Sequence, residues 1–151
     1  MVVSILLYGC EIWTLLADDE RRIQALETRC LRKLLRISYR EHKTNDNVRS
    51  LVKSLVCLQE PLLATVRRRK LACFGHVMRH GTLSKVIIQG TVKGGRRRGR
   101  QRRKSRSDNV KDWLEMTFPD LLSMAANRTV WRRTSASSAL TSPLRLQKSR
   151  D

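Results

Sequence analysis

Between positions 17 and 37 the apolar residues recur at steps of three and four, the spacing that places side chains on one face of an α-helix. These positions are Ile23, Leu26, Cys30, Leu34 and Ile37. Acidic residues stand at the start of the segment and basic residues at its end, an order that stabilises a helix through its dipole. We therefore predict an amphipathic helix here, with the Asp18-Asp19 pair capping its start.

Two further helices of this kind are predicted downstream. One begins near Thr44, whose hydroxyl can cap free amides, and carries on its inner side Val48, Leu51, Val52, Leu55 and Val56. The other has Pro61 in its first turn, runs to about Arg79, and buries Leu62, Leu63, Val66, Phe74 and Val77. Three helices can shield one another's apolar faces, so residues 17–90 form a predicted helical module whose clear pattern ends near residue 80.

The C-terminal part predicts a weaker arrangement. Asp108 begins one short helix and Pro119 another, and their apolar residues are Val110, Trp113, Leu114, Leu121, Leu122, Met124, Ala125 and Trp131. We assign residues 107–134 to this helical pair and residues 135–151, rich in Ser and Thr, to a disordered tail. The predicted fold class is mainly α: a small helical bundle, a disordered basic linker over 91–106, the weaker helical pair and a flexible tail.

The first sixteen residues are mostly apolar, with Glu11 as an interruption. They fall short of the roughly 20 residues that span a bilayer, and no basic segment precedes them, so we expect neither a membrane anchor nor a signal peptide. The run from Val2 to Tyr8 is typical of a buried strand in a larger protein. We therefore expect a chain truncated at its N-terminus.

The net charge of the protein indicates the class of its partner. The sequence has 32 Lys and Arg against 13 Asp and Glu, a formal net charge of +19. A compact monomer of this charge repels itself unless a polyanion neutralises it. The basic residues do not follow one side of an apolar helix, as they do in helices that lie on membranes. We expect RNA or DNA as the partner, with no membrane and no small-molecule substrate.

Two basic clusters are the candidate phosphate contacts. Arg67, Arg68, Arg69 and Lys70 are predicted to form a belt on the outside of the third helix. The run from Lys93 to Arg106 holds nine basic residues and no acid. Its proposed contacts are Lys93, Arg96, Arg97, Arg98, Arg100, Arg102, Arg103 and Lys104. Such cations release condensed counterions when they neutralise phosphates. A solvated linker is the alternative interpretation, and nuclear import is a compatible second role.

The candidate catalytic motif is the Asp18-Asp19 pair, which superficially resembles the paired carboxylates of polymerases that hold Mg²⁺. Leu16 takes the place of the usual aromatic residue, and no partner aspartate lies upstream. We therefore interpret the pair as a helix cap and predict no catalytic residue and no cofactor.

The candidate metal ligands are Cys73, His76 and His80, which share one helix, with Cys57 as a possible fourth. The spacing permits zinc without requiring it, and we favour His76 as a packed, hydrogen-bonded residue near the core edge. The cysteines contain no CxxC pair and are expected to be reduced. Trp113 and Trp131 are interpreted as core residues, with stacking on bases as the alternative.

Six stretches carry a family resemblance through their order and spacing. They are Tyr8–Leu15; Arg29–Arg32 with Leu35–Ile37; Thr44-Asn45; Arg69–Leu71 with Phe74–Arg79; Gly99-Arg100 with Asp108–Trp113; and Ala126–Arg128 with Trp131-Arg132. In this order they resemble the C-terminal region of LINE-type (non-LTR) retrotransposon proteins, the jockey-like and RTE-like endonuclease–reverse transcriptases. The family commonly has a tryptophan where this sequence has Ser105–Ser107, and this departure bears on how residues 107–133 pack.

The resemblance implies a parent protein with RNA-directed DNA polymerase activity, whose palm and endonuclease lie upstream of the region seen here. It makes residues 1–16 a remnant of the polymerase domain, which then becomes a partner of the rest. The expected function is that of a non-catalytic, nucleic-acid-binding fragment in the nucleus or cytoplasm. A helical docking module and a relic without selected function are the alternatives.

Overall fold

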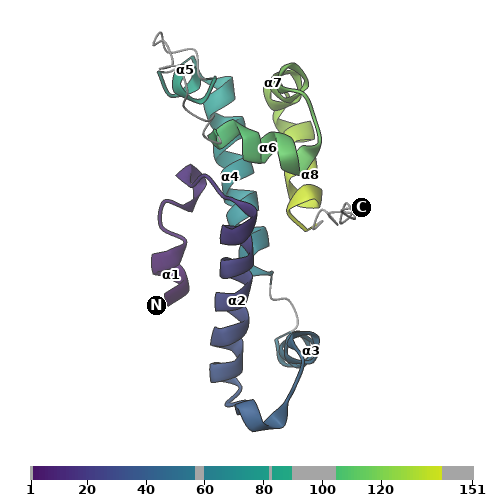
Figure 1. The fold of residues 1–151 in the computed structure, drawn as a ribbon. Helices are drawn as coiled ribbons and strands as arrows, with labels where there is room; N and C mark the ends of the chain where they lie inside the picture. Colours follow the sequence, from purple (N-terminus) through teal and green to yellow (C-terminus); the bar gives the residue numbers. More distant parts are fainter. Residues whose placement is uncertain (1, 57–59, 82, 90–104, 141–151) are drawn as a thin grey trace, which may run out of the picture. The chain divides into compact units, whose positions relative to one another are not determined.

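The computed structural model of the chain describes residues 2–56, 60–81, 83–89 and 105–140, and it is mainly helical, as predicted (Figure 1). Its elements in order are α1 (Val2–Leu6), the 3-10 helix η1 (Cys10–Ile12), α2 (Ala17–Leu34), the 3-10 helix η2 (Tyr39–Glu41), α3 (Asn45–Leu55), α4 (Leu62–Arg79), α5 (Leu83–Gln89), α6 (Arg106–Leu114), α7 (Phe118–Ala126) and α8 (Arg128–Leu140). No strand occurs in these described ranges.

The chain divides into two compact units, and one boundary falls inside α4. Unit 1 comprises residues 1–14 and 67–151, and unit 2 comprises residues 15–66. The sequence pattern placed the end of the helical module near residue 90 instead. The difference arises because Leu71, Phe74 and Met78 of α4 pack with α6, α7 and α8 in the core of unit 1.

Polar side chains fix the helix starts of unit 2. A carboxylate oxygen of Asp19, the third residue of α2, accepts a hydrogen bond from the amide of the N-cap residue Leu16 at 3.1 Å. Asp19 thus helps to cap α2, whereas Asp18 of the predicted pair contacts Arg21. The Thr44 hydroxyl accepts one from the Asn47 amide at 3.3 Å, which confirms the predicted cap of α3. These bonds satisfy amides that the first turn of a helix leaves without backbone partners.

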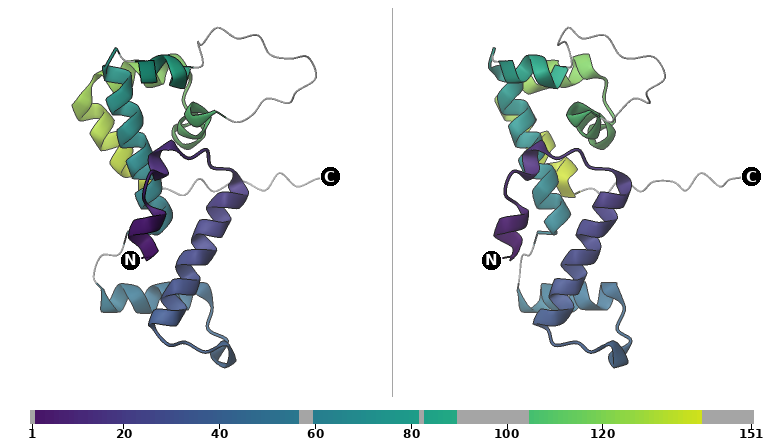
Figure 2. Two further views of the ribbon diagram at one scale, coloured as in Figure 1. Left: turned by 90° about the vertical axis from the view of Figure 1, so that its left-hand side faces the viewer. Right: turned by 60° about the vertical axis from the view of Figure 1, so that its left-hand side comes forward.

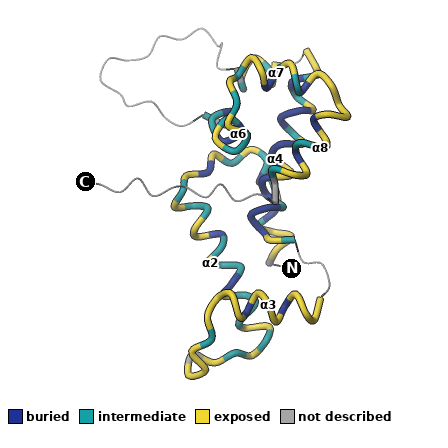
Figure 3. Tube along the Cα trace, turned by 90° about the vertical axis from the view of Figure 1, so that its right-hand side faces the viewer, coloured by how far each residue is buried: buried dark blue, intermediate teal, exposed yellow. Residues whose placement is uncertain are grey.

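Only one row of α3 is covered. Val48 and Val52, one turn apart, are buried. Leu51, Leu55 and Val56 are exposed, so their predicted place on the inner side is wrong. Figure 3 shows that most of α3 is exposed. The reason is that, within the described part of unit 2, α3 makes its one extensive helix contact with α2. A single neighbouring helix covers only one row of side chains.

The predicted weak pair at the C-terminus is instead part of the core of unit 1. Figure 1 shows α6, α7 and α8 beside the C-terminal part of α4. The buried cluster consists of Leu71, Phe74, Met78, Val110, Leu121, Ala125 and Trp131. The Trp131 indole N–H donates a hydrogen bond to the Leu71 carbonyl at 2.9 Å, and its ring centroid lies 5.6 Å from that of Phe74. Trp131 therefore joins α8 to α4.

Gly75 makes this close approach of α8 possible. A Cβ at position 75 would lie 2.1 Å from Nε1 of Trp131, closer than side-chain atoms ever approach. The absence of a side chain at Gly75 is therefore what gives the indole its place against α4.

The predicted strand near the N-terminus is wrong, because Val2–Leu6 form the helix α1. Leu7 and Cys10 are buried, whereas Ile5 and Tyr8 are exposed. A strand must find hydrogen-bond partners on a neighbouring strand, and the described ranges contain none. A helical turn satisfies backbone groups within the segment itself.

Two predicted helix starts near the C-terminus differ in outcome. Ser105, and not Asp108, precedes α6, and the Asp108 carboxylate accepts a hydrogen bond from the Ser105 amide at 2.7 Å. Asp108 thus serves as the third residue of a capping box. Pro119 lies in the first turn of α7, as predicted.

The predicted disordered tail is wrong for residues 135–140, which belong to α8. The Ser135 hydroxyl donates to the Trp131 carbonyl, and the Ser137 hydroxyl donates to the Arg133 carbonyl at 3.2 Å. Bonds of this kind let serine remain inside a helix although its composition suggested a tail. Trp131, which we had placed on the helix opened by Pro119, lies on α8 instead.

We predict that Gly75→Ala lowers the free energy of unfolding by about 2 kcal/mol, because displacing Trp131 outweighs the better helix propensity of alanine. Urea denaturation followed by circular dichroism measures this. Gly81→Ala is the matched control, since a Cβ there meets nothing within 4 Å. Equal stabilities of the two variants would contradict the close approach of Gly75 and Trp131.

Candidate nucleic-acid interface

The four consecutive cations of α4 do not share one environment. Arg67 and Lys70 are only 3% and 2% exposed, whereas Arg68 and Arg69 are exposed. The prediction that all four lie on the outside of the helix is therefore wrong for Arg67 and Lys70. Residues three and four apart share a helix face, so these two lie in line with the buried Leu71 and Phe74.

Lys70 connects three segments of unit 1. Its ammonium donates hydrogen bonds to the Trp13 carbonyl and, at 3.2 Å, to the side-chain oxygen of Asn109 on α6. Figure 2 shows η1, which directly precedes Trp13, beside α4. A buried charge is tolerated only when protein groups replace its water. Lys70 is thus a structural residue.

Arg67 and Arg69 also contact other parts of unit 1. The Arg67 guanidinium lies over the Trp113 ring, 5.3 Å from the ring centroid, a cation–π geometry. Arg69 donates to the Leu7 carbonyl at 3.1 Å. Trp131 is buried within the core cluster, which confirms its interpretation as a core residue, whereas Trp113 is partly buried and packs against the cluster.

Besides Arg68 and Arg69 of α4, exposed cations are found on other helices. On α2 of unit 2 they include Arg22, Arg29 and Lys33, which follow one face at steps of seven and four. On α8 of unit 1 they are Arg128, Arg132 and Arg133. Sequence reasoning missed the α8 residues, although one signal was available: no acidic residue occurs between Asp120 and Asp151.

The acidic side chains are largely engaged at or near helix starts. The Asp19 and Asp108 carboxylates accept hydrogen bonds from backbone amides at the starts of their own helices. The Glu27 carboxylate accepts one from the Leu62 amide at 2.8 Å. Two exposed carboxylates pair one turn along their own helix, Asp18 with Arg21 at 3.3 Å and Asp46 with Arg49 at 3.8 Å. Among the described residues, no carboxylate forms an ion pair with the arginines of α8.

The pKa values of Cys10 and Glu41 are shifted, and neither shift makes a reactive site. Burial of the Cys10 side chain raises the pKa of its thiol, which favours the neutral and less nucleophilic form. A hydrogen bond from Lys43 lowers the pKa of the exposed Glu41 carboxyl. Both shifts follow from local structural contacts.

The candidate metal ligands do not form a three-ligand group in the part of the chain that the structure describes. Cys57 lies outside that part, and Cys73 is half-buried. The rings of His76 and His80 lie 4.5 Å apart between centroids. His76 is exposed, so its predicted place as a packed residue near the core edge is wrong. Its neighbours Phe74 and Gly75 occupy the buried side of α4 instead.

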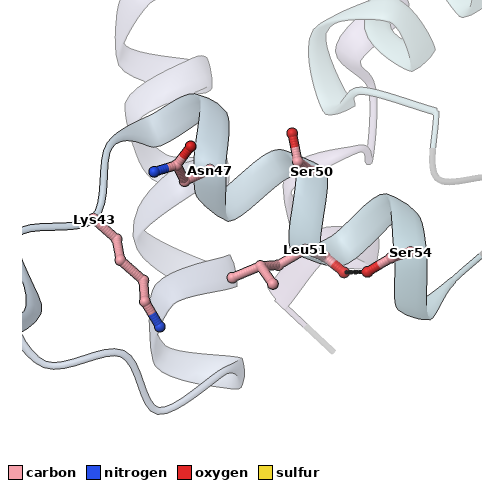
Figure 4. Close-up of a pocket in the computed structure, with 5 residues that line it drawn as sticks. All are labelled: Lys43, Asn47, Ser50, Leu51 and Ser54. Carbon is pink, nitrogen blue, oxygen red and sulfur yellow. Dashed lines mark hydrogen bonds between the residues drawn. The ribbon is translucent and has the colours of Figure 1, made fainter.

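Unit 2 has a surface pocket of about 420 Å³ on α3 and the turn before it (Figure 4). Its lining residues are Lys43, Asn47, Ser50, Leu51 and Ser54. The Ser54 hydroxyl donates to the Leu51 carbonyl at 2.7 Å, and Lys43 pairs with Glu41 at 2.7 Å. The five residues contain no nucleophile beside a general base, so they do not assemble a catalytic group.

The basic run lies almost entirely outside the described residues. This holds for each of its proposed contacts, Lys93, Arg96, Arg97, Arg98, Arg100, Arg102, Arg103 and Lys104. Their role in binding stays a prediction. The run meets the described chain at Ser105, which begins α6.

Comparison with known proteins gives no relative: no family model, no curated protein and no solved structure matches this chain. Among the helices described, none combines the length and the apolar character needed to cross a membrane.

We predict that Lys70→Met lowers the free energy of unfolding by about 1–3 kcal/mol, because the Trp13 carbonyl and the Asn109 side chain lose a buried donor. Urea denaturation measures the loss. Arg68→Met, a change of the same kind at an exposed neighbour, is expected to stay within about 0.5 kcal/mol of the wild type. If the Arg68 variant loses as much as the Lys70 variant, the assignment of Lys70 as a structural residue fails.

Proposed function

We propose that this chain is a non-catalytic module that binds RNA or DNA through phosphate contacts. The observation that carries the proposal is the separation of its cations by environment. Arg67 and Lys70 are buried within the fold, whereas Arg128, Arg132 and Arg133 are exposed in a stretch without acids. Exposed cations of this kind bind phosphates with release of counterions and need no base sequence.

We further propose that the module is the C-terminal fragment of a retrotransposon reverse transcriptase, with the polymerase domain as its natural neighbour. Contacts within unit 1 support this origin. Lys70 joins the Trp13 carbonyl to Asn109, and Trp131 joins α8 to the Leu71 carbonyl. Four of the stretches that carry the resemblance thus contribute to one core.

A helical docking module is the second candidate function, because large apolar side chains are exposed in both units. In unit 2, Leu34 is 78% exposed and Leu55 is 69% exposed. In unit 1, Ile5 and Tyr8 are exposed as well. Apolar side chains of this size are common at surfaces that pack against another protein.

The salt dependence of binding tests the proposed function. We predict that the wild type binds a fluorescent structured RNA and both single- and double-stranded DNA, with affinity that falls steeply as salt rises. A variant with Arg96, Arg97, Arg98, Arg100, Arg102 and Arg103 changed to Gln should bind more weakly. Its logarithmic salt slope should be shallower by up to about 0.7 for each lost contact on single strands.

Two results would decide against this account. If the wild type binds none of the three nucleic acids, the phosphate-binding proposal fails and the docking module takes its place. If the wild type binds and the six-residue variant binds alike, the basic run is not a contact, and the described helices must supply the binding surface.

A further inference from the structure

We infer that α8 carries a second contact surface, built on the folded core and suited to the backbone of a double-stranded nucleic acid. It consists of Arg128, Arg132 and Arg133, which we name the α8 arginine face. The inference rests on the proposed nucleic-acid-binding function and adds to it a location and a substrate class.

The α8 arginine face is held in a fixed orientation by the residue in its midst. Trp131 is 2% exposed, and its indole N–H bonds to the Leu71 carbonyl at 2.9 Å. Arg128 and Arg132 are four residues apart, which places them on neighbouring turns about 6 Å apart along the axis. Arg133 follows directly and is also exposed. Arg128 and Arg132 therefore lie on one side of a helix that Trp131 anchors to the core, and Arg133 lies about a quarter turn further round.

The electrostatics of α8 favour an anionic partner. The three arginines lie in the first six residues of the helix, and Arg128 lies in its first turn, at the positive end of the helix dipole, where a cation is disfavoured. No described carboxylate pairs with them. A bound polyanion relieves this repulsion.

The free amides at the start of α8 are not the binding groups. The side-chain oxygen of Asn127 accepts hydrogen bonds from the Thr129 and Val130 amides at 3.1 and 3.3 Å. The first turn is therefore capped from within the chain. The arginine side chains, and not the helix terminus, make the surface.

The side chains around the arginines favour a duplex over a single strand. Proteins that bind single strands gain much of their affinity by stacking bases on aromatic rings. The aromatic residue of α8, Trp131, is buried and has no face to offer. The exposed neighbours Thr129, Ala136 and Ser137 are small and let the helix approach a backbone closely. A duplex has its bases already stacked and carries phosphates at twice the density along its axis.

Charge-matched variants of the full chain test the inference. One variant changes Arg128, Arg132 and Arg133 to Gln. The control changes three exposed cations scattered over α2, η2 and α3, Arg22, Arg40 and Lys53, to Gln and removes the same charge. Fluorescence anisotropy across a salt series compares 20-base-pair duplexes of DNA and of RNA with single-stranded DNA of the same length.

We expect the α8 variant to bind a duplex about tenfold or more weakly, with a salt slope shallower by up to about 0.9 per lost contact. The scattered control should lose less than about threefold. A loss with either duplex supports the inference and identifies which duplex the face contacts. An equal loss in both variants, or an equal loss on single strands, overturns it.

A measurement on the unaltered chain covers the case in which the α8 variant fails to fold. Phenylglyoxal modifies accessible arginines, and mass spectrometry locates them. Duplex should protect Arg128, Arg132 and Arg133 more than the reference residues Arg22 and Arg40. If duplex binds and protection does not favour α8, the inference alone fails. If the wild type binds no nucleic acid, the proposed function fails with it.

Discussion

The contact between Gly75 and Trp131 is the constraint on which unit 1 depends. Side chains normally set the distance between the backbone of an α-helix and its neighbours. At Gly75 no side chain intervenes, so Trp131 lies directly against the backbone of α4. The indole then reaches the Leu71 carbonyl, packs on Phe74 and closes the buried cluster. Because Trp131 lies among the arginines of α8, the same contact that completes the core also orients the cationic surface.

Electrostatics adds a second constraint, since a chain of net charge +19 must fold against its own repulsion. Two of the cations are buried and stabilised by contacts within the fold. Lys70 donates hydrogen bonds to oxygen atoms of Trp13 and Asn109, and Arg67 lies over the ring of Trp113. Most described acids are engaged close to helix starts. The exposed arginines are left for a polyanion, which is the physical basis of the proposed function.

Periodicity predicted α2, α3 and α4 well, because an apolar stripe and a cap such as Thr44 are local features of the chain. Periodicity predicted the wrong environment for Lys70, which was expected on the outside and is buried. Lys70 lies on the same helix face as the buried Leu63 and Phe74, but its hydrogen-bond acceptors lie 57 and 39 residues away in the sequence, so the local pattern does not reveal them. Periodicity also cannot say which neighbour covers a face, so Leu55 was expected inside and is exposed. The arginines of α8 were missed because the prediction looked for phosphate contacts in dense basic runs, whereas Arg128 is separated from Arg132 and Arg133 by the buried Trp131 and its neighbours.

The central claim is that the folded chain, and not merely its charge, creates the nucleic-acid surface. The most direct test is the unfolding midpoint, followed by circular dichroism, with and without a random-sequence duplex at low and at high salt. A ligand raises the midpoint only if it prefers the folded state. The account predicts a rise at low salt that disappears at high salt. An unchanged or lowered midpoint at low salt, with binding demonstrated, would mean that the duplex binds the unfolded polycation equally well and would contradict the claim.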